Sequence, residues 1–173
     1  MLPLIKPGKS TIPKSAIMKK LEIILIAGAL IGFMLALFNL PYSSVIVTFL
    51  FIALSVLYFY FGFALFNGIH LRQIFKTESY KGIGPWRIAV AIGAGIALSD
   101  LTIGFMLTIN NYPMAKSFLT FGLVLAAVIL LLASLRNDRE KHQFYTNIIL
   151  RCAIFIILGV AALFLHGQLS QTT

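Results

Sequence analysis

Charged residues are scarce in this chain of 173 residues: lysine, arginine, aspartate and glutamate make up 11% of it, and hydrophobic residues make up 60%. A soluble domain has about 25% charged and 45–50% apolar residues. The sequence therefore lacks the polar surface that a soluble globular domain needs. We predict an integral membrane protein, and the length favours a single domain.

Cysteine occurs once, at Cys152 within an apolar run, which excludes a disulfide framework and is typical of a small buried hydrophobic residue. His70 and His142 lie on predicted loops, and His166 lies at the far end of the last apolar run. The sequence has no HExxH motif, no Walker loop and no spacing typical of metal ligands. We therefore predict no catalytic residue, no metal site and no cofactor, and we do not expect an enzyme.

Acidic residues are also few, so the formal net charge is +9. Such a charge can indicate nucleic-acid binding, but here the basic residues lie in short blocks between apolar runs. That distribution is typical of membrane topology signals, and anionic lipid headgroups are the expected partner of the blocks. Nothing in the sequence resembles a module that reads DNA or RNA, so we expect no nucleic-acid partner.

Long apolar runs are what the sequence has in abundance. Five of them approach the length of about 20 residues that a spanning helix needs. We predict an all-α, polytopic bundle with spans at about 21–40, 44–66, 87–109, 116–135 and 144–165. These spans form one transmembrane domain over 18–166, with a flexible basic tail at 1–17 and a short tail at 167–173.

The basic blocks predict the orientation of the bundle, because cytoplasmic loops collect lysine and arginine. The first tail and the connections at 67–86 and 136–143 are basic, so the N-terminus is predicted to be cytoplasmic and the C-terminus outside. The outer turns and the last tail then hold one basic residue, Lys116, at a span boundary. Trp86 and Arg87 are expected to anchor the third span at the membrane interface.

Small residues predict where the helices pack. Gly28 and Gly32 have GxxxG spacing in the first span, which favours close contact with another helix, within the chain or between copies. In the third span, Gly93, Ala97 and Gly104 fall on one helical face, and Asp100 shares that face. We therefore interpret the third span as the central helix of the bundle, with Asp100 turned inward.

Asp100 and Arg151 are the candidate functional residues, because an intramembrane charge is costly and by default indicates a functional site. At a rise of about 1.5 Å per residue, Asp100 lies roughly 20 Å and Arg151 roughly 10 Å from the cytoplasmic ends of their spans. Three interpretations are open. The two side chains satisfy each other, or bind backbone and water, in a structural role; Asp100 is a protonatable site on an ion or proton path; or Asp100 meets a charge on another protein.

Another acidic residue, Glu22, lies at the cytoplasmic end of the first span beside Lys19 and Lys20. A carboxylate near a helix N-terminus and near cations is stabilised without any special role. We therefore expect Glu22 to be an ordinary residue of a helix end.

The third and fourth predicted spans resemble a known family. The segments 103–109 (IGFMLTI), 112–115 (YPMA) and 121–123 (FGL) are similar to the transmembrane hairpin of the GldL family of Bacteroidota gliding motility and type 9 secretion. That hairpin typically reads IGALFKI, WPGA and IGL. The resemblance covers about a quarter of the chain and implies an inner-membrane protein of a bacterium of that phylum.

The chain departs from the GldL pattern at residues that matter for activity. Thr108 stands where the family has lysine, and Tyr112 stands where it has tryptophan. The membrane glutamate that is linked to proton flow in the family would fall near Ala126, which cannot carry a proton. Motor activity is therefore not implied, and no functional residue is carried over.

These observations predict a small integral protein of the bacterial inner membrane that acts as a structural or accessory subunit of a membrane assembly. Its expected partners are other membrane proteins or copies of itself. The alternative is a small transporter, or a protein that conducts protons or ions, using Asp100 and Arg151.

Overall fold

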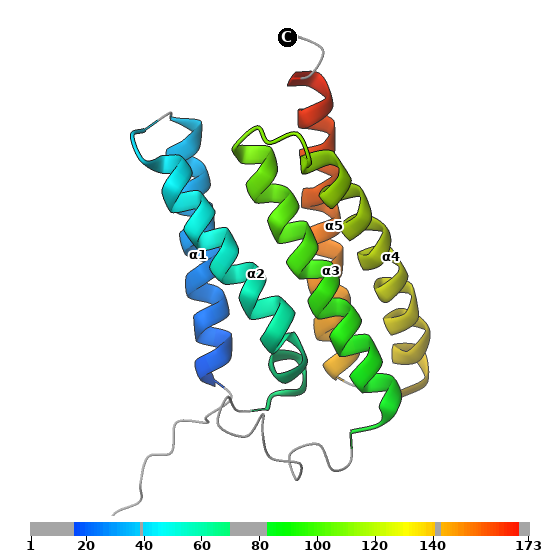
Figure 1. Ribbon diagram of the computed structural model, residues 1–173. Helices are drawn as coiled ribbons and strands as arrows, with labels where there is room; N and C mark the ends of the chain where they lie inside the picture. Colours follow the sequence, from blue (N-terminus) through cyan, green and yellow to red (C-terminus); the bar gives the residue numbers. More distant parts are fainter. Residues whose placement is uncertain (1–15, 39, 70–82, 141–142, 170–173) are drawn as a thin grey trace, which may run out of the picture.

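The computed structural model describes residues 16–38, 40–69, 83–140 and 143–169. All regular elements in these stretches are helices (Figure 1), in the order α1 (Ala16–Leu37), α2 (Ser43–Asn67), α3 (Pro85–Ile109), α4 (Ala115–Glu140) and α5 (Gln143–Leu169). All five are long and apolar enough to cross a membrane. The prediction of an all-α chain with five helices of spanning length is therefore confirmed.

The helices extend beyond several of the predicted spans. α4 continues from the predicted end at 135 to Glu140, and α5 continues from 165 to Leu169. A helix needs an apolar surface only within the membrane, and arginine and glutamate are good helix formers outside it. The predicted tail at 1–15, residues 70–82 of the basic connection and the last residues from 170 onward lie outside the described residues.

Residues suited to helix ends separate the helices. Gly68 ends α2 with a positive φ of 67°, and its N–H donates to the carbonyl of Ala64, which is the usual left-handed helix cap. Pro85 opens α3 at a position where its missing N–H costs nothing. Tyr42 and Asn111 also have positive φ, at 66° and 56°, and each lies in a short turn that joins two antiparallel helices.

The helices are arranged around α3. α2 packs against α1 on one side and α3 on the other, and α3 also contacts α4 and α5. In Figure 1, α5 lies behind α3 and α4, while α1 and α2 form the opposite side of the bundle. α3 is the most deeply buried of the five helices, so the prediction that it is the central helix is confirmed.

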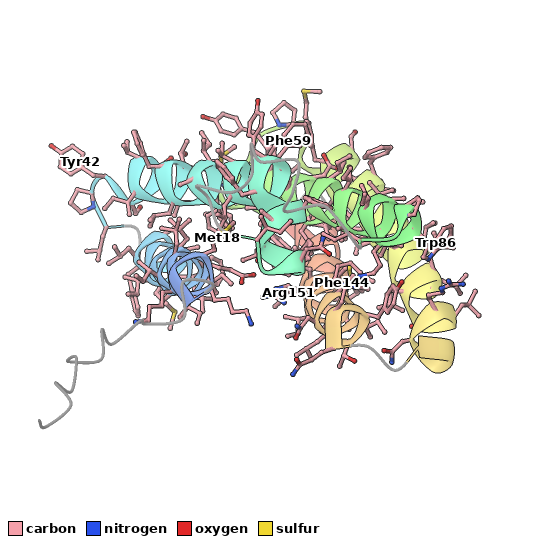
Figure 2. All side chains as sticks on the ribbon, turned by 90° about the horizontal axis from the view of Figure 1, so that it is seen from below. Met18, Tyr42, Phe59, Trp86, Phe144 and Arg151 are labelled. Atoms are coloured by element: carbon pink, nitrogen blue, oxygen red, sulfur yellow. The ribbon has the colours of Figure 1, made fainter. Side chains whose placement is uncertain are left out.

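The outer faces of the bundle are apolar. Seen along the helices in Figure 2, Tyr42 and Phe59 project away from the bundle. Large exposed apolar side chains occur on every helix, such as Phe49 of α2 and Ile157 of α5. A surface of this kind fits hydrocarbon rather than water.

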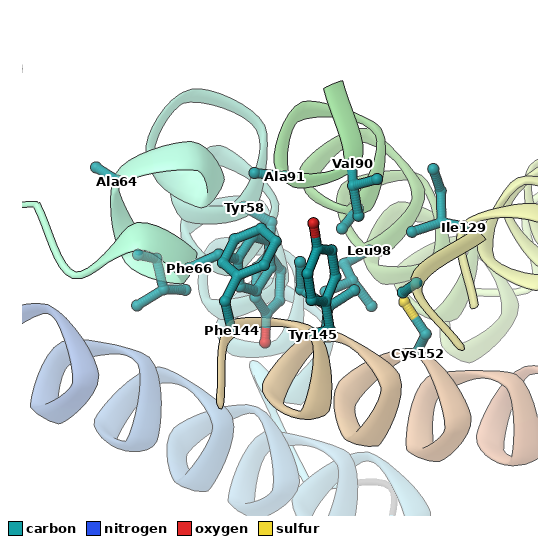
Figure 3. Packing of buried hydrophobic residues seen from close by; sticks show 14 of the residues in the cluster. Tyr58, Ala64, Phe66, Val90, Ala91, Leu98, Ile129, Phe144, Tyr145 and Cys152 are labelled. Atoms are coloured by element: carbon teal, nitrogen blue, oxygen red, sulfur yellow. The ribbon is translucent and has the colours of Figure 1, made fainter. Parts of the chain in front are cut away.

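The largest core cluster lies where α2, α3, α4 and α5 meet. Figure 3 shows Tyr58 and Leu98 beside Tyr145 and Cys152 of α5 in this cluster. Cys152 is fully buried, as the sequence predicts for a small hydrophobic residue. The core thus joins the helices through aromatic and small side chains together.

The backbones of α2 and α3 approach each other closely at Gly62 and Gly95. A Cβ atom on Gly95 would lie 2.6 Å from the Tyr58 carbonyl oxygen, and one on Gly62 would lie 2.9 Å from Gly95 Cα. Because both residues lack a side chain, the backbones come close enough for the buried hydroxyls of Ser55 and Ser99 to form a 2.7 Å hydrogen bond. Close backbones and interhelical hydroxyl bonds are typical of membrane helix packing.

The predicted small-residue faces pack within the chain. Added Cβ atoms on Gly28 and Gly32 would lie 3.1 Å from Leu50 and 3.4 Å from Val47, both on α2. The glycines therefore bring α1 onto α2.

The small-residue face of α3 is directed toward α4. Added Cβ atoms on Gly93 and Gly104 would lie 2.5 Å from Ile129 and 2.8 Å from Leu119 of α4. Ala97, between them on α3, is fully buried. These faces are thus filled by neighbouring helices of the same chain.

We predict that Gly95→Leu destabilises the protein by about 1–3 kcal/mol or more, because the new side chain overpacks the contact with the α2 backbone. Thermal unfolding of the purified protein in detergent measures the change. Gly84→Ala is the matched control, since a Cβ there meets nothing within 4 Å. Equal melting temperatures for Gly95→Leu and Gly84→Ala would contradict the close approach of α2 and α3.

Candidate functional site

A bidentate ion pair joins the first helix to the last. Arg151 of α5 donates from Nε to Glu22 Oε1 at 2.8 Å and from Nη2 to Glu22 Oε2 at 2.7 Å. Figure 2 shows Arg151 in the space between α1 and α5. Two parallel charge-assisted hydrogen bonds fix both distance and orientation, which a lysine could not do.

Other groups complete the surroundings of this pair. The Tyr58 hydroxyl of α2 donates to Glu22 Oε1 at 3.0 Å, and Arg151 Nη1 donates to the Asn147 carbonyl at 3.3 Å. The guanidinium also lies over the Phe66 ring, with 5.6 Å between its central carbon and the ring centroid. Glu22 is only 3% exposed and Tyr58 is fully buried. Three helices therefore meet at one carboxylate.

The ion pair bears on one interpretation that the sequence leaves open and corrects one expectation. Arg151 pairs with Glu22 and not with Asp100, and Glu22 is a buried structural partner rather than an ordinary residue of a helix end. The sequence signal that could have revealed this pair is the distance of each charge from the start of its helix. Glu22 lies about 9 Å from the start of α1 and Arg151 about 12 Å from the start of α5, so the two charges are at nearly the same height in the bundle.

Asp100 lies apart from this pair, on α3. It is half-buried, and its Oδ2 atom is buried without a hydrogen-bond partner among the described residues. Ile96 and Ile92, one and two helical turns before it, are 36% and 48% exposed. Asp100 therefore lies at the boundary between the buried side and the outward side of α3, neither enclosed in the bundle nor fully exposed.

Helical geometry explains this boundary position. Asp100 is three residues from Ala97, which is buried, but four residues from Ile96, which is exposed. Both spacings place two residues on the same side of a helix. Asp100 thus lies on the boundary between the side of α3 that faces α4 and the side that faces outward, and spacing alone cannot choose between them.

The other polar contacts hold the ends of the bundle. At one end, Asn110 of α3 binds Ser44 and also donates to Thr48 Oγ1 at 3.3 Å, so it ties the end of α3 to the start of α2. At the opposite end, the Arg87 guanidinium lies 4.7 Å from the centroid of the Phe144 ring.

The two predicted interfacial anchors lie at the start of α3. Trp86 is exposed there, and Arg87 follows it in the first turn of the helix. Their role at a membrane interface stays a prediction. Within the described stretches, histidine, cysteine, aspartate and glutamate nowhere form a group of three or more that could hold a metal ion.

Compared with known protein families, curated proteins and solved structures, the chain matches none. The resemblance of its third and fourth helices to the GldL hairpin therefore stays a prediction. The argument for function rests on the polar groups of the chain itself.

We predict that Glu22→Ala and Arg151→Ala each destabilise the protein by about 3–5 kcal/mol, because each leaves the opposite charge buried and unpaired. The double variant should lose less than the sum of the two single variants. A double-mutant cycle of thermal or denaturant unfolding in detergent measures the coupling, with the exposed Lys19→Ala as control. Strictly additive losses would contradict the pairing.

Proposed function

We propose that this chain is an accessory subunit of an assembly in a bacterial inner membrane, and that it binds another membrane protein through the outward side of α3. The single observation that carries the proposal is Asp100. A carboxylate at the edge of a membrane-facing surface is costly unless something satisfies it. A partner that covers this side of α3 would remove Asp100 from lipid.

Other polar groups within the helices already have partners inside the chain, which favours the outward side of α3 as the contact surface. Glu22 and Arg151 are matched within the chain, and Ser55 and Ser99 bond each other between α2 and α3. The glycine faces of α1 and α3 are filled by α2 and α4. After these internal contacts, the carboxylate of Asp100 is the group that a partner protein would stabilise most.

The proposed placement in the membrane follows from the basic segments. With the N-terminus in the cytoplasm, the starts of α1, α3 and α5 lie at the cytoplasmic side and the C-terminus lies outside. The similarity of 103–123 to the GldL hairpin supports a Bacteroidota inner membrane as the location. Anionic headgroups are the proposed contacts of the basic segments.

The first test of this proposal is site-specific crosslinking in the membranes of the source cell. A photoreactive amino acid at Ile96 is expected to give one adduct of defined mass, because Ile96 lies beside Asp100 on the proposed contact surface. The same residue at Ile157 of α5, which is 69% exposed, is the matched control and should react with lipid alone. No adduct at Ile96, or the same adducts at both positions, would contradict the proposal.

The second test separates the proposal from proton or ion conduction. A conducting role for Asp100 with Arg151 is weakened because Arg151 is bound to Glu22 on another side of the bundle. In proteoliposomes with an imposed potential and an internal pH dye, we expect wild type and Asp100→Asn to show the same proton flux as empty vesicles. A flux that wild type supports and Asp100→Asn abolishes would instead favour conduction.

A further inference from the structure

The unmatched carboxylate at Asp100 limits which partner can bind the proposed surface. We infer that the partner presents a membrane-spanning helix with one arginine or lysine at the depth of Asp100. This inference rests on the proposed function and adds the chemistry of the partner. An opposite charge satisfies the carboxylate and cancels its charge, whereas an apolar helix would only bury it without a partner.

The position of Asp100 gives the depth of the basic residue. Asp100 is about 22 Å along α3 from Pro85 and about 13 Å from the other end at Ile109. It thus lies within the hydrocarbon, a few ångströms from the middle of the helix. Aspartate is too short to bring its charge to the headgroups from there, so the matching cation has to come to Asp100.

The side of α3 around Asp100 presents exposed apolar residues in line with the acid. Ile92, Ile96 and Asp100 succeed each other at intervals of four residues, so two exposed apolar side chains lead to the acid along one line. A partner helix along this line would pack its apolar residues on the two isoleucines and place its basic residue against the carboxylate. The apolar contacts would supply the buried area, and the charge pair would fix the position of the partner helix along α3.

A second copy of this chain does not supply that cation. Within the described part of the spans, Arg151 is the basic residue away from the helix ends, and its Nε and Nη2 atoms already donate to the two carboxylate oxygens of Glu22. Lys116 is the second residue of α4, about 12 Å in depth from Asp100, which exceeds the length of a lysine side chain. Copies that meet through this side of α3 would bring two carboxylates together.

The inference is tested with the full chain in vesicles of neutral phosphatidylcholine, which removes attraction to anionic headgroups. The probe is a leucine–alanine spanning peptide of about 20 residues with one central arginine, and its matched form has leucine instead. Energy transfer between a dye on the peptide and a dye on an N-terminal tag reports association. We expect the arginine peptide to bind about tenfold or more tightly than the leucine peptide.

Variants of the chain then locate the contact. Asp100→Asn is expected to reduce binding of the arginine peptide to the level of the leucine peptide. Asp100→Lys should reverse the preference, so that a peptide with a central glutamate binds better than the arginine peptide. The double change Asp100→Asn with Ile157→Asp moves the carboxylate to α5 and should not restore binding. Unchanged melting temperatures show that each variant is folded.

The outcomes separate this inference from the proposed function. Equal binding of the arginine and leucine peptides to the wild type would overturn the basic partner, while a specific adduct at Ile96 would still support the subunit role. Restored binding in the variant that carries Ile157→Asp would also overturn it, because any exposed carboxylate would then suffice. Energy transfer between two labelled copies that depends on Asp100 would identify a second copy as the occupant and overturn it as well.

Discussion

The ion pair between Glu22 and Arg151 is the contact on which the arrangement of the outer helices depends. α1 packs along α2, and the pair ties it to α5 on the far side of the chain. A single unpaired charge in hydrocarbon is very costly, so the ion pair holds α1 and α5 beside each other. Tyr58 adds the third helix to the same carboxylate. The charges specify which helices are neighbours, while the apolar side chains, which fit lipid almost as well as one another, cannot do so.

Small residues determine how closely the helices then approach. Gly62 and Gly95 bring the backbones of α2 and α3 together, and this proximity allows Ser55 and Ser99 to bond each other. Asn110 makes a similar connection at the end of the same interface. Polar contacts therefore occur both in the buried middle of the α2–α3 interface and at one of its ends. Asp100 differs from these groups, because its Oδ2 atom is buried without a hydrogen-bond partner among the described residues.

The architecture could be predicted from the sequence, whereas the site could be predicted only in part. Length and apolar composition were enough for five helices, and the small residues of α3 were enough to identify the central one. The pair of Glu22 with Arg151 was missed because Glu22 was compared with the lysines next to it in sequence rather than with charges at its own depth. The direction of Asp100 could not be predicted from spacing, because a residue that is three positions from Ala97 and four from Ile96 lies between two sides of a helix. The positions of α2 and α4 in the folded bundle decide how far Asp100 is covered.

The link between the first and last helices has a consequence for biosynthesis. Glu22 and Arg151 are 129 residues apart in the chain. A ribosome that has delivered α1 therefore has more than a hundred further residues to add before Arg151 is made. Until then the nascent chain carries the Glu22 carboxylate without its partner. Completion of this part of the fold is thereby coupled to the synthesis of α5, and a product that stops before α5 keeps the acid unneutralised.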